Sequence, residues 1–189
     1  MKEQIQQILM SRERRRIEDA RLRRAAVLVP LYEKDGELYL LLTKRTETLP
    51  LHKGEVSFPG GRCQACDQSP LETALREAYE EVGVRSEDVE VLGELDEVAT
   101  FSSAFAVTPF VGFIPYPYPF QVNPAEIQEL IPLPLSALRG PAVFREEVQR
   151  RADGYEVPVY FYDYGPHTIW GLTARILKGF LELLPERRF

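Results

Sequence analysis

Three glutamates that lie close together in the chain have the chemistry of a metal site. Glu77, Glu80 and Glu81 fall in the segment 70–82, whose apolar spacing predicts a helix. At about 100° per residue they share one side of that helix. The adjacent side is apolar and consists of Leu71, Ala74, Leu75, Ala78 and Val82. Like charges at these spacings destabilise a helix by about 0.2–0.5 kcal/mol per pair. A divalent cation would offset that repulsion, because Mg²⁺ and Mn²⁺ prefer carboxylate oxygens.

Two neighbouring features favour a metal site over a solvated acidic face, which the glutamate spacing alone also fits. Gly60-Gly61 stands upstream, between a predicted strand and the helix. Glycine there lets the backbone come close to a ligand and present a carbonyl oxygen to a metal. Arg76 precedes the first glutamate, and its guanidinium could hold a neighbouring carboxylate in position.

The ends of the helix are also marked in the sequence. Ser69 is suited to the N-cap, Pro70 to the first helical position, and Glu72 to the capping-box position three residues after the serine. Gly83 is well placed to end the helix, because glycine readily takes a left-handed conformation there. We therefore expect a helix over residues 70–82.

The elements around this helix indicate an α/β fold. Apolar segments 25–32 and 38–43 flank Asp35-Gly36, which predicts a β-hairpin with a tight turn. Further strands are predicted at 89–97, 104–114, 127–133 and 155–162, and a final helix at 168–184. Strands and helices that alternate within one domain favour a mixed sheet covered by helices.

The region around the three glutamates resembles the signature of a known family. Gly60-Gly61 followed by residues 76–84, REAYEEVGV, is similar to the Nudix box, G-x5-E-x7-R-E-U-x-E-E-x-G-U with U apolar. The sequence departs from the box in one place. Asp67 stands where the first glutamate is usual, and eight residues instead of seven separate it from Arg76.

This departure is familiar among the coenzyme A diphosphatases of the superfamily, and the upstream sequence resembles theirs. Residues 41–45, Gly54 and residues 58–61 are similar to the signature L-L-T-x-R-[SA]-x3-R-x3-G-x3-F-P-G-G. Two positions differ: Thr46 replaces Ser or Ala, and Pro50 replaces an Arg that could contact a substrate phosphate.

The resemblance implies roles for particular residues in an α/β/α sandwich that binds Mg²⁺ or Mn²⁺. Glu77 and Glu81 correspond to the principal metal ligands, with Glu80 as a third ligand or water-orienting group and the Gly60 carbonyl completing the site. Arg76 would orient a carboxylate. Arg45 and Gly61 are expected to bind the substrate, Arg45 through its phosphates, for which Lys44 is the other candidate. The general base stays open among Glu80, Glu97, Glu126 and Glu129.

The implied reaction is attack of water on a phosphorus of a diphosphate. The expected substrate is coenzyme A or a derivative, cleaved to 3',5'-ADP and 4'-phosphopantetheine. ADP-ribose, dinucleotides such as NADH, and capped RNA are alternative substrates. A non-catalytic module that binds a nucleotide or an acyl-CoA is an alternative of another class, which the intact glutamates disfavour. A homodimer is possible.

Charge and hydropathy limit the other partners. Residues 1–24 carry eight basic against four acidic side chains, so the remainder of the chain, whose total charge is −6, has a charge of −10. We expect residues 1–24 to form a basic helix packed on a single domain, 25–189, and the acidic domain disfavours a nucleic-acid partner. No apolar segment is as long as the roughly 18 residues that a membrane-spanning helix needs. We therefore expect no membrane contact and a cytoplasmic protein.

The remaining metal-binding residue types give weaker signals. Cys63 and Cys66 have C-x-x-C spacing, yet the two histidines, His52 and His167, do not complete a zinc-finger pattern. The surroundings also do not suggest a thioredoxin-like pair. These observations favour ordinary loop cysteines and histidines that serve in turns or caps.

Overall fold

The computed structural model describes residues 1–48, 52–100, 103–140, 142–150 and 154–185, so Pro50 lies outside the described residues. Within them, eight strands form the main sheet: β1 (Arg23–Lys34), β2 (Glu37–Arg45), β3 (Val56–Ser57), β4 (Gly60–Arg62), β5 (Glu90–Glu94), β6 (Val98–Ala99), β7 (Phe105–Phe113) and β8 (Ile127–Pro134). The central path is β3-β2-β1-β7-β5, with β4 beside β1, β6 beside β7 and β8 beside β2. The sheet is mixed because β1 and β7 run parallel while the other pairs are antiparallel.

The predicted hairpin is confirmed. β1 and β2 pair through Lys34 and Glu37, which leaves Asp35 and Gly36 as a two-residue turn. Both residues have positive φ, 53° and 79°. This is the backbone that suits the twist of two antiparallel strands, and Asp-Gly adopts it at little cost.

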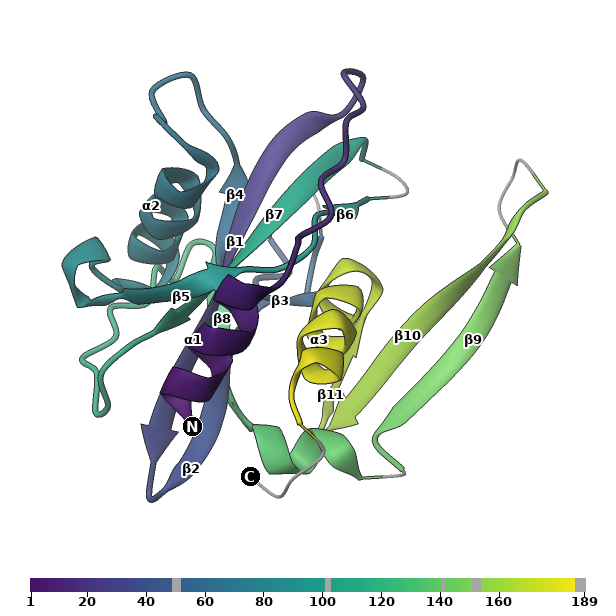
Figure 1. The fold of residues 1–189 in the computed structure, drawn as a ribbon. Coiled ribbons are helices and arrows are strands. Elements are labelled where there is room, and N and C mark those ends of the chain that lie inside the picture. Colours follow the sequence, from purple (N-terminus) through teal and green to yellow (C-terminus); the bar gives the residue numbers. More distant parts are fainter. Residues whose placement is uncertain (49–51, 101–102, 141, 151–153, 186–189) are drawn as a thin grey trace.

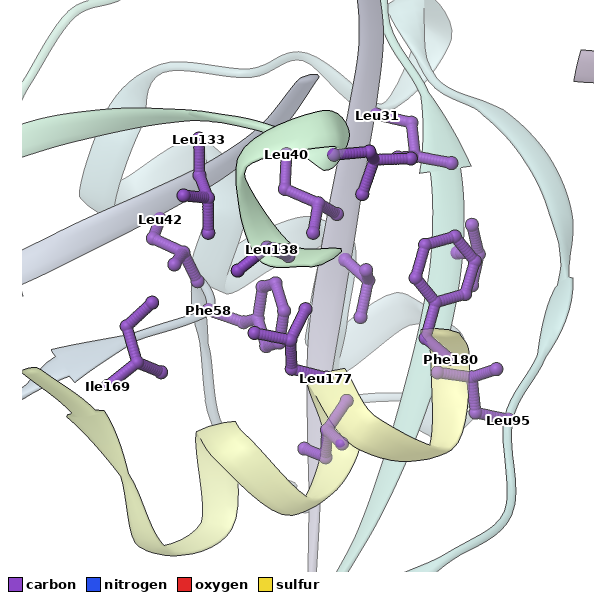
Figure 2. Close-up of a cluster of buried hydrophobic side chains, with 14 of the residues drawn as sticks. Leu31, Leu40, Leu42, Phe58, Leu95, Leu133, Leu138, Ile169, Leu177 and Phe180 are labelled. Carbon is purple, nitrogen blue, oxygen red and sulfur yellow. The ribbon is translucent and has the colours of Figure 1, made fainter. Parts of the chain in front are cut away.

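Helices cover both faces of the main sheet (Figure 1). α2 (Pro70–Val82) packs on one face, where Ala74, Ala78 and Val82 join the buried sheet residues Leu28 and Phe110. α1 (Lys2–Ser11) and α3 (Gly171–Leu183) contribute to a larger cluster on the opposite face. Figure 2 shows part of it: Leu31, Leu40, Leu42, Phe58, Leu95, Leu133, Leu138, Ile169, Leu177 and Phe180. The expected α/β/α sandwich is thus confirmed.

A second sheet follows the first and explains where the prediction of the last helix was wrong. β9 (Phe144–Arg150), β10 (Glu156–Tyr164) and β11 (His167–Trp170) form an antiparallel sheet in the order β11-β10-β9, and β9 and β10 extend away from the domain (Figure 1). The final helix begins at Gly171 instead of 168, because residues 167–170 pair with β10. β9 was missed because all seven of its residues are exposed, so its sequence has no alternation of apolar residues.

The expectation of a helix through residue 24 is also wrong. α1 ends at Ser11, and Arg12 is already extended, with φ −103° and ψ 148°. The following segment is held by carboxylates: Arg12 pairs with Asp96, and Arg14 pairs with Glu94 at 3.0 Å. These tertiary ion pairs hold the basic segment as an extended strap on the acidic end of β5 and on the connection after it, so much of its charge is neutralised within the molecule.

Glu97 fastens this strap to the sheet. Its carboxylate accepts hydrogen bonds from the Ile17 amide at 2.6 Å, from Arg24 at 3.0 Å and from the Thr108 hydroxyl at 3.0 Å. Burial raises the pKa of Glu97, but these three donors together lower it by more. The net shift is therefore downward. α1 itself rests on the domain through Ile5 and Leu9, which are buried.

Two short 3-10 helices complete the fold, η1 (Ser86–Asp88) and η2 (Leu135–Arg139). In the described part of the chain, no helix is long and apolar enough to cross a membrane.

Candidate active site

The predicted ends of α2 are confirmed. The Ser69 hydroxyl accepts a hydrogen bond from the Glu72 amide at 3.2 Å, and Pro70 occupies the first turn. At the other end Gly83 has φ 74°, and its amide bonds to the Tyr79 carbonyl at 2.9 Å. Both ends satisfy backbone groups that a helix leaves without partners, so the first and last turns of α2 are stabilised.

The glycine pair on β4 brings the backbone against two different neighbours. A Cβ at Gly60 would lie 2.5 Å from the Ala26 carbonyl oxygen, and a Cβ at Gly61 would lie 2.4 Å from Cδ of Glu77. Any side chain here would therefore push β4 away from β1 or push the glutamate away from β4. Gly60-Gly61 is required because the sheet edge and the acidic side of α2 meet without room for a Cβ.

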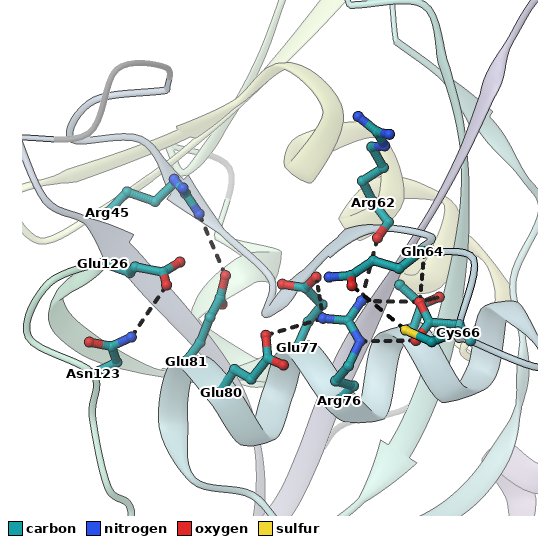
Figure 3. A network of polar contacts seen from close by, with 12 residues as sticks. Arg45, Arg62, Gln64, Cys66, Arg76, Glu77, Glu80, Glu81, Asn123 and Glu126 are labelled. Atoms are coloured by element: carbon teal, nitrogen blue, oxygen red, sulfur yellow. Dashed lines mark hydrogen bonds and ion pairs between the residues drawn. The ribbon is translucent and has the colours of Figure 1, made fainter.

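Arg76 organises the acidic side of α2 (Figure 3). Its guanidinium donates to Asp67 through Nε at 2.9 Å and Nη2 at 3.1 Å, to Glu77 at 2.8 Å and to Glu80 at 3.1 Å. It also reaches the Arg62 carbonyl at 3.4 Å. One arginine thus connects the loop before the helix to two of the three predicted glutamates, in keeping with the orienting role expected for Arg76.

Asp67, which the sequence showed only as a departure from the box, is the anchor of this network. Its side chain is 3% exposed. Besides Arg76 it accepts hydrogen bonds from the Gln64 amide and the Thr73 hydroxyl, both at 2.8 Å. Arg76 foremost, with these two donors, holds the pKa of Asp67 well below its usual range. The one-residue insertion is absorbed in the loop, and the carboxylate still reaches the arginine.

Glu81 lies at the centre of the site and is only 2% exposed. One carboxylate oxygen faces an Arg45 nitrogen at 3.5 Å, and the other, Oε2, is buried with no hydrogen-bond partner among the described residues. Burial raises the pKa of Glu81 to about 8. Arg45 opposes the shift, whereas Glu77 and Glu126 add to it. A buried carboxylate with a free oxygen is costly unless a cation completes its surroundings.

Glu77 and Glu126 extend this negative region. Burial raises the pKa of Glu77, with Arg76 lowering it and Glu80 and Glu126 raising it. Glu126 comes from the segment just before β8, beside the end of β2, where it accepts a hydrogen bond from the Asn123 side chain at 3.3 Å. Elements distant in sequence therefore direct carboxylates toward the same place.

The side chains fit a divalent cation, although they are not gathered around one. Among the described residues, no three aspartate, glutamate, histidine or cysteine side chains lie together as a ready-made metal centre. The reason is visible in Figure 3: Arg76 takes up Glu77 and Glu80, and Arg45 faces Glu81. The donors are nevertheless carboxylate oxygens, as Mg²⁺ and Mn²⁺ prefer, and the unpartnered Oε2 of Glu81 is an oxygen that a cation could use.

Other candidates for the general base lie in different surroundings. Glu97 is fully engaged by the strap and by Thr108. Glu129 faces His167 at 3.4 Å. Glu80, which is half exposed, and Glu126 remain beside the cluster. His52 contacts Glu55 at 2.9 Å, in keeping with a turn residue.

Replacing Gly61 with alanine tests the close approach of β4 to α2. The added Cβ would displace the Glu77 carboxylate, so we expect Mn²⁺ affinity to fall by about 10–100-fold, as when groups that support metal ligands are lost. Isothermal titration calorimetry measures this. Gly179→Ala is the matched control, because a Cβ there meets nothing within 4 Å. Equal Mn²⁺ affinity in the two variants would contradict the prediction.

The comparison with protein-family models shows to which family the chain belongs. A family model described as the NUDIX domain matches residues 22–151, well over half of the chain. The chain belongs to the Nudix family. It is similar to the uncharacterized Nudix hydrolase NudL of Photorhabdus laumondii, with 45% identity over 156 residues that cover 82% of this chain and 81% of the relative. A NudL of Yersinia pestis is 43% identical over 157 residues, covering 82% and 77%. The protein is thus a Nudix hydrolase.

A solved structure shares the fold. The Ap4A hydrolase of C. elegans, crystallised as a binary complex, superposes with a TM-score of 0.51 at 20% identity, over 60% of this chain and 81% of that one. At this identity the similarity concerns the fold alone. It agrees with the α/β/α layers described above.

Proposed function

We propose that this Nudix hydrolase cleaves the diphosphate bond of coenzyme A or its derivatives, giving 3',5'-ADP and 4'-phosphopantetheine. The observation that carries the reaction type is Glu81, a buried carboxyl next to the Gly60 backbone with one oxygen unpartnered. The observation that favours this substrate is the similarity of residues 41–61 to the coenzyme A diphosphatase signature. The signature runs along β2 to Arg45, which faces Glu81.

Some residues of the site would bind a cation and another would bind the substrate. Glu77 and Glu81, with Glu80 and the Gly60 carbonyl, would hold Mg²⁺ or Mn²⁺. When bound, such a cation supplies charge neutralisation on the diphosphate and a lowered pKa for a water molecule. Arg45 faces Glu81 at 3.5 Å, and we expect its guanidinium to contact a phosphate oxygen of the substrate.

Proton transfer falls to a carboxylate near the cluster. Glu80 and Glu126 remain as bases, since each lies beside the predicted ligands and accepts few hydrogen bonds. Either could take the proton of the attacking water. Asp67 acts through Arg76 and keeps Glu77 and Glu80 directed toward the site.

Product analysis tests the proposal. The protein is incubated with Mg²⁺ or Mn²⁺ and, separately, with coenzyme A, ADP-ribose, NADH and a capped RNA, and the products are separated by chromatography. We expect 3',5'-ADP from coenzyme A to appear faster than any other product. Faster cleavage of another diphosphate would overturn the substrate and keep the reaction. No cleavage of any of them would favour a binding module.

A further inference from the structure

The cysteine pair lies in the loop that carries the anchor of the active site. Cys63 follows β4 directly, and its amide bonds to the Arg24 carbonyl at 3.0 Å, which fixes its backbone to β1. Cys66 is exposed, and its Sγ lies 3.7 Å from the side-chain oxygen of Gln64. Both thiols are free, and they are the only two cysteines in the sequence.

A closed turn connects these thiols to the residues that contact α2. The Asp67 amide bonds to the Gln64 carbonyl at 3.1 Å, and the Gln64 amide bonds back to the Asp67 carboxylate at 2.8 Å. Cys63 immediately precedes this turn, and Cys66 lies within it, next to Asp67. The position of Cys66 is thereby coupled to that of Asp67, whose carboxylate binds Arg76.

From this placement we infer that Cys63 and Cys66 form a reversible disulfide, and that its formation loosens the Asp67–Arg76 anchor. The Cys66 thiolate attacks one sulfur of a small disulfide, RSSR, and displaces RS⁻. The Cys63 thiolate then attacks Sγ of Cys66 and displaces the second RS⁻. The two thiol protons leave with the two RSH products, so one small disulfide is reduced for each protein disulfide formed.

The geometry of the loop indicates how the disulfide would act on the contact between Asp67 and Arg76. A disulfide needs the two Cβ atoms about 3.5–4.5 Å apart and a dihedral angle near 90°. Sγ of Cys66 contacts the Gln64 side-chain oxygen at 3.7 Å, a contact that the disulfide would replace, and the Cys63 backbone is held to β1. The resulting movement passes to the Gln64–Asp67 turn, and Asp67 withdraws from Arg76. Arg76 then binds Glu77 and Glu80 more strongly, which reduces their availability to a metal.

Glutathione disulfide provides the test. After treatment and gel filtration we expect the intact mass to fall by about 2 Da, both thiols to stop reacting with a chromogenic disulfide, and Mn²⁺ affinity to fall by about tenfold, the lower end for lost support of metal ligands. The melting temperature should fall by about 5 °C. Dithiothreitol should restore all four values. Cys66→Ser is the control and should show none of these changes.

The outcomes separate this inference from the proposed function, on which only the effect on metal binding rests. Intermolecular dimers, a stable mixed disulfide or unreacted thiols would overturn the intramolecular disulfide. A disulfide with unchanged Mn²⁺ affinity and melting temperature would overturn its coupling to Asp67. Reduced protein that binds no Mn²⁺ would contradict the proposed function, and the coupling would then be decided by the melting temperature alone.

Discussion

Replacing Glu81 with glutamine is expected to stabilise the metal-free protein and to remove most of its activity. The carboxyl is 2% exposed, its Oε2 has no described partner, and burial raises its pKa from 4.5 to about 8. A neutral amide avoids burying this charge. We expect a gain on the order of 1–3 kcal/mol in the free energy of unfolding at pH 8, the usual cost of an unsatisfied buried polar group.

The pH dependence of stability identifies the cause. Because the folded protein holds the Glu81 proton up to about pH 8 and the unfolded chain releases it near pH 4.5, the folded state binds more protons between these values. Stability of the metal-free wild type should therefore fall as pH rises through this range, and Glu81→Gln should lack that part of the fall. Urea denaturation in EDTA at pH 5, 6, 7 and 8 measures the slope.

The same substitution should reduce kcat by about 10²–10³-fold, comparable with the loss of a group that stabilises transition-state charge. Added Mg²⁺ should raise the melting temperature of the wild type and have much less effect on Glu81→Gln. Glu80→Gln is the control for stability, because the Glu80 side chain is 50% exposed. A Glu81→Gln variant that is less stable than wild type at pH 8 would show that the carboxylate is well compensated without metal.

Replacing Arg76 with alanine should be the most destabilising change in the site. It leaves the nearly buried Asp67 with only the Gln64 amide and the Thr73 hydroxyl as donors. Removing one partner of a buried pair costs about 3–5 kcal/mol, and the partial exposure of Arg76 places the expected loss at about 3 kcal/mol. Activity should fall as well, since Glu77 and Glu80 lose their common partner.

The difference in stability between the wild type and Arg76→Ala should become smaller at acidic pH. Arg76 and the other donors lower the pKa of Asp67, so the stability that Asp67 contributes is present above about pH 4 and is lost as pH falls below it. Wild type and Arg76→Ala should therefore be closer in stability at pH 3 than at pH 7 in urea denaturation. Arg85→Ala, which removes exposed pairs with Glu87 and Asp88, should cost below about 1 kcal/mol.

A double substitution separates the buried charge from other effects of Arg76. If the cost comes from an uncompensated Asp67 carboxylate, Asp67→Asn combined with Arg76→Ala should be more stable than Arg76→Ala alone. Equal stability of the single and double variants would assign the cost instead to the lost contacts of the arginine with Glu77, Glu80 and the Arg62 carbonyl.

The elements that could be predicted from the sequence are those specified by neighbouring residues. The turn at Asp35-Gly36 and the ends of α2 depend on local backbone preferences and capping side chains. The same holds for the glutamates, whose spacing on a helix places them on one side whatever lies opposite. Their acidic surroundings, however, also include Glu126, which comes from a segment more than 40 residues later.

The features that could not be predicted depend on partners distant in sequence. Arg12 becomes extended because Asp96 binds it, and the partners of Glu97 include Ile17 and Arg24. β9 carries no burial pattern because every residue is exposed. Asp67 stands at an unusual distance from Arg76 along the chain, so only the fold of the loop shows that they pair.

Because α1 and the strap pack on the sheet, the folded domain begins earlier in the chain than the segment that the family model matches. The family match starts at residue 22, yet Leu9 packs where a Cβ on Gly93 would come within 2.7 Å of it. A chain that begins at residue 22 would leave Glu94 and Asp96 without the arginines that pair with them. It would also expose the apolar surface that α1 covers. Fragments intended for crystallisation or calorimetry should therefore retain the first 21 residues.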